Sequence, residues 1–508
     1  MTARGSVLVA SGIALSRLAG LARERTLAHV LGDGPPADAF RAALRIPNVV
    51  QNLLGEGVLS ASFIPVYARL LAEGRHADAR RVAGAVLALI LATAGAATLV
   101  GIAAAPWLVD VLAPGFHPDL RDETAALVRL TFPMTGLLAV SAWGLGVLNS
   151  HRRFFASYAA PVAWNLAIVS ALLAGSATPE DALRRAGWGA LAGGLLQGLV
   201  MVPTLWRVAP DLRPAWASGD VHVAQVIKQA GPAILGRGVV QISSLVDGVL
   251  ASLLAPGSLA AIGYAQTLTQ LPFALFGAST AAAELPELAR QQGDPAALAA
   301  RTRAAVERVA WLSIGSAVAL TTLSEPLVGT FFQTGRFDAG SVERVGRVVA
   351  AFAPGLAASA ASRPLVSALS ALGDTAGPAR IATVRVITSL ALGLSLMLAV
   401  ESIPSLGWTA PWPTSVPWGA AMLGVASSVA AFVEATMLGL RLSARAPNSH
   451  ARLGVLARAT AIAAVAAAVA LIVPKTGWSA LADGIATAAT FSLCWLVLAR
   501  AAGGPRLR

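Results

Sequence analysis

The sequence is poor in cysteine, in histidine and in charged residues of every kind. Its 508 residues include a single cysteine, Cys494, which excludes a disulfide bond within the chain and a metal site built from several thiolates. The six histidines are scattered without metal-ligand spacing, so no metal and no cofactor is expected. Charged residues form 13% of the chain, against about 25% in a soluble domain. The composition therefore argues against a sizeable soluble domain.

Apolar residues are what the chain has in excess. They form 56% of it, the mean hydropathy is +0.68, and apolar stretches of about 20 residues recur from end to end. This pattern predicts an all-α polytopic membrane protein. We expect fourteen membrane-spanning helices, near residues 5–31, 37–68, 82–109, 123–149, 156–175, 187–206, 222–254, 258–289, 302–324, 342–372, 378–401, 416–441, 452–473 and 477–499.

The positive charge of the chain is distributed unevenly across the predicted membrane. The net charge is +12, but the basic residues fall mostly in short loops, which argues against nucleic-acid binding. Twenty-three Lys and Arg residues lie on one side and seven on the other. The more basic side of a membrane protein is normally cytoplasmic, so both termini are expected in the cytoplasm. The opposite side holds Trp408, Trp412 and Trp418, which suit an interfacial aromatic belt.

An internal repeat relates the two halves of the chain. Residues 64–69 correspond to residues 285–290, a shift of 221 that moves the chain by six spans. An even number of spans makes the two halves parallel repeats, and two parallel lobes around a central cavity are typical of alternating-access transporters. We expect two parallel six-helix lobes at 1–215 and 216–445, followed by two further helices at 446–508.

Five arginines lie inside the first two apolar segments, where a charge costs about 2.5–3.5 kcal/mol at the centre of the membrane. They are Arg17, Arg23, Arg25, Arg41 and Arg45. Such residues usually face a polar cavity or a charged ligand, and the guanidinium group matches phosphate and carboxylate. Arg17 and Arg23, about 9 Å apart along a helix, could converge on one large anion through their long side chains or through a bend at Gly20. Alternatively, Arg23, Glu24 and Arg25 mark the outer helix end and extend to the interface.

The second apolar segment contains residues that interrupt helices. Pro47 should kink the span, and Gly55-Glu56-Gly57 supplies a flexible point with an acidic group. Transporters place binding groups and hinges in broken helices that line a cavity. Asp38 follows a proline-rich turn, so it is a helix cap, a cavity residue or both.

These motifs resemble the MurJ/MviN family, the lipid II flippases of the multidrug, oligosaccharidyl-lipid and polysaccharide exporter superfamily. The fourteen-span layout is similar as well. The resemblance rests on Ser16-Arg17-Leu18, Arg23-Glu24, Ala37-Asp38-Ala39-Phe40, Arg45-Ile46-Pro47-Asn48, Leu54-Gly55-Glu56-Gly57 and Phe63-Ile64-Pro65, with similar motifs at Gln241-Ile242, Val246-Asp247, Leu271-Pro272 and Phe276-Gly277.

The resemblance implies a multi-pass protein of the bacterial cytoplasmic membrane that moves lipid II, a disaccharide-pentapeptide on undecaprenyl diphosphate, to the outer leaflet. It implies that the headgroup binds a cationic cavity between two lobes and that the last two spans hold the lipid tail. Expected partners are lipid II and membrane lipids, with cell-wall synthesis proteins as further candidates. By position, Arg17, Arg23, Asp38 and Asn48 correspond to substrate-binding residues, and Arg45 stands in the same motif.

The chain departs from the family pattern where relatives often carry arginine. Gln51 and Asn52 replace an arginine pair, and Gln266-Thr267 replaces an Asp-Arg step. Arg237, which aligns with Arg17 in the repeat, is a substitute for the missing cations, and Arg363 is the alternative.

Two acidic residues of the second half have open roles. Asp247 fits one position of a sodium site found in some relatives, but span 11 offers only Thr388 and Ser389 there. Glu434 is either a proton or cation site or the ion-pair partner of Arg441.

Other functions are less consistent with the sequence. An exporter of another polyprenyl-linked glycan is the nearest alternative, whereas a drug exporter should have an acidic cavity. A membrane glycosyltransferase would need an Asp-x-Asp pair, which the sequence lacks. We therefore predict a transporter and not an enzyme.

Overall fold

The computed structural model describes residues 3–175, 178–217, 219–273, 294–374, 376–412, 414, 416–472 and 479–502. Within these ranges the regular secondary structure is helical, and extended pairing is confined to two isolated β-bridges. This confirms the predicted all-α class. The helices are α1 (Ala3–Leu31), α2 (Pro35–Leu54), α3 (Glu56–Ala72), α4 (His76–Ala103), α5 (Ala105–Leu112), α6 (Pro118–Thr131), α7 (Pro133–Ser150), α8 (Phe154–Leu173), α9 (Pro179–Val208), α10 (Val221–Ser252), α11 (Ser258–Pro272), α13 (Pro295–Thr322), α14 (Ser324–Phe332), α15 (Ala339–Ala371), α16 (Ala376–Val400), the short 3-10 helix η2 (Pro404–Leu406), α17 (Gly419–Ser443), α18 (Leu453–Leu471) and α19 (Ala480–Ala501).

Within the described ranges, eleven helical segments are long and apolar enough to cross a membrane, and each coincides with a predicted span. Two of them join consecutive helices, α2 with α3 and α6 with α7. Two further predicted spans coincide with α1 and α10, which are helices of 29 and 32 residues. The span predicted at 258–289 begins as α11, but residues 274–293 lie outside the described residues. The full count of fourteen spans therefore stays a prediction.

The chain divides into two compact units, Met1–Gly257 (unit 1) and Ser258–Arg508 (unit 2). α10 belongs to unit 1, where it packs against α2, α3, α4 and α5. The lobes predicted from the repeat, with boundaries at 215 and 445, assign α10 to the second lobe. These predicted lobes are defined by sequence similarity and not by packing, and they stay a prediction.

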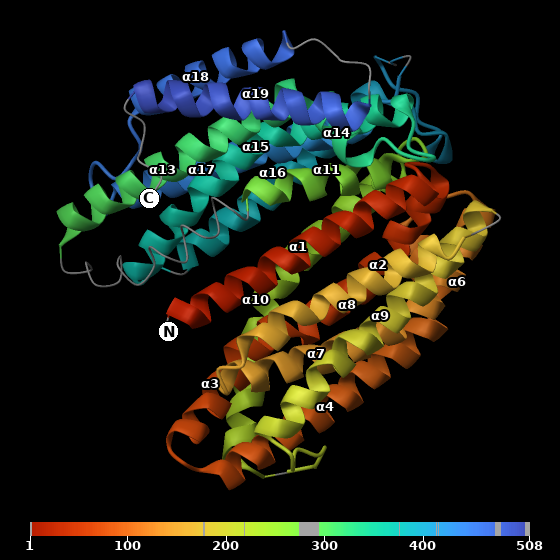
Figure 1. The fold of residues 1–508 in the computed structure, drawn as a ribbon, viewed down its shortest axis with the longest axis vertical. Helices are drawn as coiled ribbons and strands as arrows, with labels where there is room; N and C mark the ends of the chain where they lie inside the picture. The colour runs from red at the N-terminus through yellow and green to blue at the C-terminus, as the bar shows by residue number, and fades with distance from the viewer. Residues whose placement is uncertain are drawn as a thin grey trace. The chain divides into compact units, whose positions relative to one another are not determined.

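In unit 1, α1 lies alongside α8, and α9 packs against both α8 and α7 (Figure 1). Phe63, Tyr67 and Trp143 are buried in a core formed by α3, α4 and α7. The segment between α9 and α10 crosses the start of α4, where the Ala215 N–H donates to the Gly84 carbonyl at 3.2 Å. Gly84 permits this approach, because a Cβ there would collide with the Arg213 carbonyl.

In unit 2, α15 packs against α11, α13 and α17, and α18 and α19 pack against each other. The Ser428 hydroxyl of α17 donates to the Ala351 carbonyl at 2.7 Å and accepts the Gly355 N–H at 3.1 Å. Both contacts flank Pro354, which has no N–H of its own. A polar side chain on one helix thus satisfies the backbone of another helix at its proline.

Candidate functional site

Arg23 and Arg41 share one carboxylate. Arg23 Nη2 lies 2.6 Å from Glu24 Oε1, and Arg41 Nη2 lies 2.7 Å from Glu24 Oε2. Glu24 is buried, with a side chain 6% exposed, and joins α1 to α2 across the turn at 32–34. Burial of a carboxylate requires such partners. Because two arginines hold one glutamate, the group keeps an excess of one positive charge.

The Arg23 guanidinium also lies over an aromatic ring. Its carbon is 4.7 Å from the centre of the Trp164 ring on α8, a cation–π distance. α1 ends at Leu31, as the predicted span does, and the alternative that Arg23 lies at the outer membrane interface stays a prediction. The Nε atom of Arg23 is buried and meets no acceptor within the described residues.

Arg17 lies on the same helix in a different environment. Its side chain is exposed, and it forms no ion pair within the described part of the chain. The helix runs through Gly20 without interruption, and a Cβ at Gly20 would find its nearest neighbour, Asn165 Oδ1, at 4.0 Å. Convergence of Arg17 and Arg23 on one anion stays a prediction.

Arg45 projects from α2 onto α10. Its guanidinium packs at Gly248, a position where any Cβ would overlap it. The neighbouring Asp247 interacts with Arg45 electrostatically, and Arg45 Nη1 is buried without an acceptor in the described residues. The structure thus brings the candidate cation-site residue Asp247 next to an arginine. A cation site at Asp247 stays a prediction.

Asp38 is buried and holds a distant part of the backbone. Its Oδ2 accepts the Gly257 N–H at 2.6 Å, at the last residue of unit 1. Gly257 has φ +93°, which favours glycine, and a Cβ there would collide with the Asp33 carbonyl. The N-cap of α2 is Gly34 and not Asp38, so the helix-cap interpretation of Asp38 is wrong.

The predicted interruption of the second span is present. α2 ends at Leu54, α3 begins at Glu56, and Gly55 between them has φ −95° and ψ −144°. Pro47 lies inside α2, and its carbonyl accepts a hydrogen bond from Thr135 Oγ1 at 3.4 Å. Asn48 follows it, half-buried. Gly57 lies in the first turn of α3, and the Glu56 side chain is outside the described residues.

Unit 2 holds a second group of charges. Glu434 on α17 pairs with Arg385 on α16 at 2.6 Å, and Arg385 Nη2 donates to Ser359 Oγ on α15 at 3.4 Å. Arg363 lies with its guanidinium carbon 5.2 Å from the Phe273 ring centre.

Arg441, the expected alternative partner of Glu434, pairs with Asp374 instead, at 2.6 Å, so that interpretation of Glu434 is wrong. Asp374 lies in the loop between α15 and α16. Its hydrogen bond from Arg441, followed by one from the Gly377 N–H, lowers the pKa of Asp374 from 3.8 to about 2.

Arg237 lies in α10, but its side chain is outside the described residues. The structure therefore brings together Arg23, Arg41 and Glu24 at one point and Arg45 and Asp247 at another. Sequence reasoning missed Glu24 as the partner of Arg41. The signal was available, because a membrane-embedded arginine pair next to a glutamate needs that carboxylate as a counter-charge.

Solved structures share this fold. One titled "Lipid II flippase MurJ, inward closed conformation" matches with a TM-score of 0.78 at 17% identity and covers 97% of this chain and 99% of its own. A multidrug resistance MATE family transporter of the MOP superfamily, in an inward-facing conformation, matches with a TM-score of 0.68 at 14% identity over 84% of this chain and 95% of its own. The shared fold and the apolar helices define a polytopic all-α membrane protein.

Sequence comparisons narrow this class to one family. The profile of the family described as "Lipid II flippase MurJ" matches residues 27–482. A probable lipid II flippase MurJ of Rhizobium tropici is 32% identical over 79% of this chain and 77% of its own length. A lipid II flippase MurJ of Burkholderia cenocepacia is 32% identical over 76% of this chain and 77% of its own length. The chain belongs to the MurJ family, which confirms the predicted family and a transporter in place of an enzyme.

Proposed function

We propose that this protein moves lipid II from the cytoplasmic to the outer leaflet of the bacterial cytoplasmic membrane. The observation that carries the proposal is the family match over residues 27–482, together with relatives that are named for lipid II. The chemistry of α1 and α2 agrees with it, because an anionic diphosphate needs fixed cations at membrane depth.

The arginines of unit 1 suit a diphosphate ligand. The Arg23–Glu24–Arg41 group keeps one positive charge in excess, and Arg17 is exposed on the same helix. Arg23 Nε and Arg45 Nη1 are buried donors without an acceptor in the described residues, and phosphate oxygens would satisfy them. We assign Arg17, Arg23 and Arg45 to the diphosphate, and Asp38 and Asn48 to the polar headgroup.

Arg237 completes the substrate-binding group in this proposal, supplying the positive charge that relatives carry at Gln51, Asn52 or Thr267. The test is whether Arg237→Ala loses complementation as Arg17→Ala does. A second test is whether adding Thr267→Arg to the Arg237→Ala variant restores complementation. If Arg237→Ala binds lipid II as wild type does, Arg363 becomes the second source of charge.

Alternating access requires segments that can change their angle. The break at Gly55 and the proline at Pro47 interrupt the second span, which supports a hinge or gate formed by Gly20, Pro47, Gly55, Glu56 and Gly57. In this proposal the lobes at 1–215 and 216–445 alternate around the headgroup, and helices of 446–508 hold the lipid tail. Both termini are cytoplasmic, and cell-wall synthesis proteins are the candidate partners.

The proposal is tested by complementation of a bacterium depleted of its lipid II flippase, with the accessibility of lipid II read on each side of the membrane. Arg17→Ala should abolish complementation at normal protein level, and Arg17→Lys should restore it only in part, because lysine keeps the charge but not the planar fork. An exporter of another polyprenyl-linked glycan would leave lipid II on the cytoplasmic side even as wild type. Normal growth with Arg17→Ala would remove Arg17 from the proposed site.

A further inference from the structure

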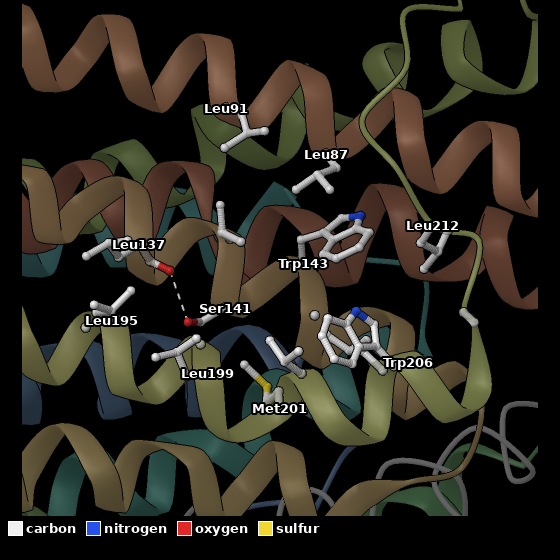
Figure 2. Close-up of a pocket in the computed structure, with 17 residues that line it drawn as sticks. Leu87, Leu91, Leu137, Ser141, Trp143, Leu195, Leu199, Met201, Trp206 and Leu212 are labelled. Carbon is white, nitrogen blue, oxygen red and sulfur yellow. Dashed lines mark hydrogen bonds between the residues drawn. The ribbon is translucent and has the colours of Figure 1, made fainter.

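An apolar cavity of about 390 Å³ lies in unit 1, away from the charged groups described above. It is formed by α4, α7 and α9, and α4 and α9 both pack against α7 (Figure 2). Its size falls within the range of about 300–1,000 Å³ that is typical of ligand pockets. None of its lining residues carries a charge.

Glycines create the space. Gly144, Gly194 and Gly198 all line the cavity, so three positions on its wall have no side chain. A Cβ at Gly198 would find its nearest neighbour, Ser141 Oγ, at 3.4 Å, which is ordinary contact. A small side chain therefore fits at Gly198, and a large one would occupy the cavity.

Two polar side chains of the wall, Ser141 and Trp143, already have hydrogen-bond partners. The Ser141 hydroxyl donates to the Leu137 carbonyl at 3.0 Å, as the dashed line in Figure 2 shows. The indole N–H of Trp143 donates to the Ala83 carbonyl at 3.0 Å. Such a wall makes contacts with hydrocarbon and offers little to a polar ligand.

The mouth of the cavity opens on an apolar surface of unit 1. Leu91 on α4 and Leu195 and Leu199 on α9 line the cavity and are also exposed. Both helices are apolar enough to cross a membrane, so a lipid acyl chain is the kind of group that suits this opening.

Two exposed arginines follow residues at one end of the cavity in the sequence. Trp206 and Leu212 line this end (Figure 2), and the residues that follow them, Arg207 and Arg213, form no ion pair within the described residues. The nearby carboxylate of Asp211 is neutralised by Arg80 at 3.3 Å. Trp206 is 70% exposed, and tryptophan is enriched at the level of lipid headgroups. Basic residues at such a level attract anionic lipid phosphates.

We propose that this cavity binds an anionic phospholipid of the surrounding bilayer, with one acyl chain between α4 and α9 and the phosphate against Arg207 and Arg213. The apolar wall suits an acyl chain, and the two arginines favour an anionic phospholipid over an uncharged lipid. This site is separate from the proposed lipid II site, and its test does not depend on transport.

The full chain is purified into nanodiscs of phosphatidylcholine that contain phosphatidylglycerol with a photoactivatable acyl chain. Irradiation should label peptides of α4, α7 and α9. Gly198→Phe should remove this label, whereas Val200→Phe should keep it, because Val200 is exposed on the same helix but does not line the cavity. Gly198→Leu is the second variant if the phenylalanine lowers the thermal unfolding temperature.

Headgroup recognition has its own measurement. Arg207→Gln and Arg213→Gln should each lower the labelling preference for phosphatidylglycerol over phosphatidylcholine about fivefold. Unchanged labelling in both Gly198 variants overturns the cavity as the binding site. Displacement of the label by undecaprenyl phosphate but not by phosphatidylglycerol overturns the phospholipid as its occupant.

Discussion

Glu24 is the residue on which the charge balance of α1 and α2 depends, because each of its carboxylate oxygens holds one arginine. Glu24→Gln removes the carboxylate that Arg23 and Arg41 share, and breaking a buried ion pair costs about 3–5 kcal/mol. We expect the purified Glu24→Gln protein to unfold at a clearly lower temperature than the wild type in the same detergent.

A second substitution separates lost charge pairing from lost packing. Adding Arg41→Gln to Glu24→Gln removes one of the two arginine charges that Glu24 balances, so the double variant should recover part of the stability. A double variant no more stable than Glu24→Gln alone would show that the ion pairs are not the source of the loss.

Asp374, in the loop between α15 and α16, makes a contribution to folding stability that depends on pH with a known sign. Its hydrogen bonds from Arg441 and the Gly377 N–H hold its pKa at about 2, below the ordinary 3.8. A carboxyl whose pKa is lowered by folding stabilises the folded state above 3.8, and the contribution is lost as the pH falls towards 2. The difference in unfolding temperature between wild type and Asp374→Asn should be constant near neutral pH and shrink below pH 3.8. A difference independent of pH would contradict this role.

At the scale of elements, the break between α2 and α3 depends on Gly55. A Cβ at this position would collide with the Gln51 carbonyl, so the backbone would have to move. Gly55→Ala should therefore lower the unfolding temperature. The matched control is Gly95→Ala in α4, where a Cβ meets nothing within 4 Å and alanine favours the helix. Equal effects of the two substitutions would mean that the backbone at Gly55 is free to adapt.

The positions of the helices were predictable because each apolar run is about as long as a membrane is thick. The interruption at Gly55 was predictable too, because glycine there follows a proline-containing helix. The partners of the charged residues were not. Glu24 holds Arg41 only because α1 and α2 meet at a particular rotation, and Glu434 pairs with Arg385 on another helix and not with Arg441 two turns away. Sequence spacing fixes neighbours within a helix but not the contacts between helices.

At the scale of the whole molecule, each compact unit holds a group of arginines in its apolar helices that pairs with a glutamate. In unit 1 the group is Arg23, Arg41 and Glu24, and in unit 2 Arg385 and Glu434 pair near Arg363. In each of these two groups the arginines outnumber the glutamate. Charge inside a membrane is costly and usually marks a functional site, and in the function proposed above its positive sign suits an anionic headgroup.

The orientation of the molecule is the remaining prediction at this scale, and it rests on the asymmetry of 23 basic residues against seven. In a Cys494→Ala background, Ser405→Cys should react with a membrane-impermeant maleimide added to intact cells, and Ala77→Cys should not. Both positions are exposed, so a difference between them reports the side of the membrane and not burial. Permeabilised cells should label both variants, and Cys494→Ala alone should label in neither case. The reverse pattern in intact cells would place both termini outside, and the headgroup would then enter the proposed cavity from the wrong leaflet.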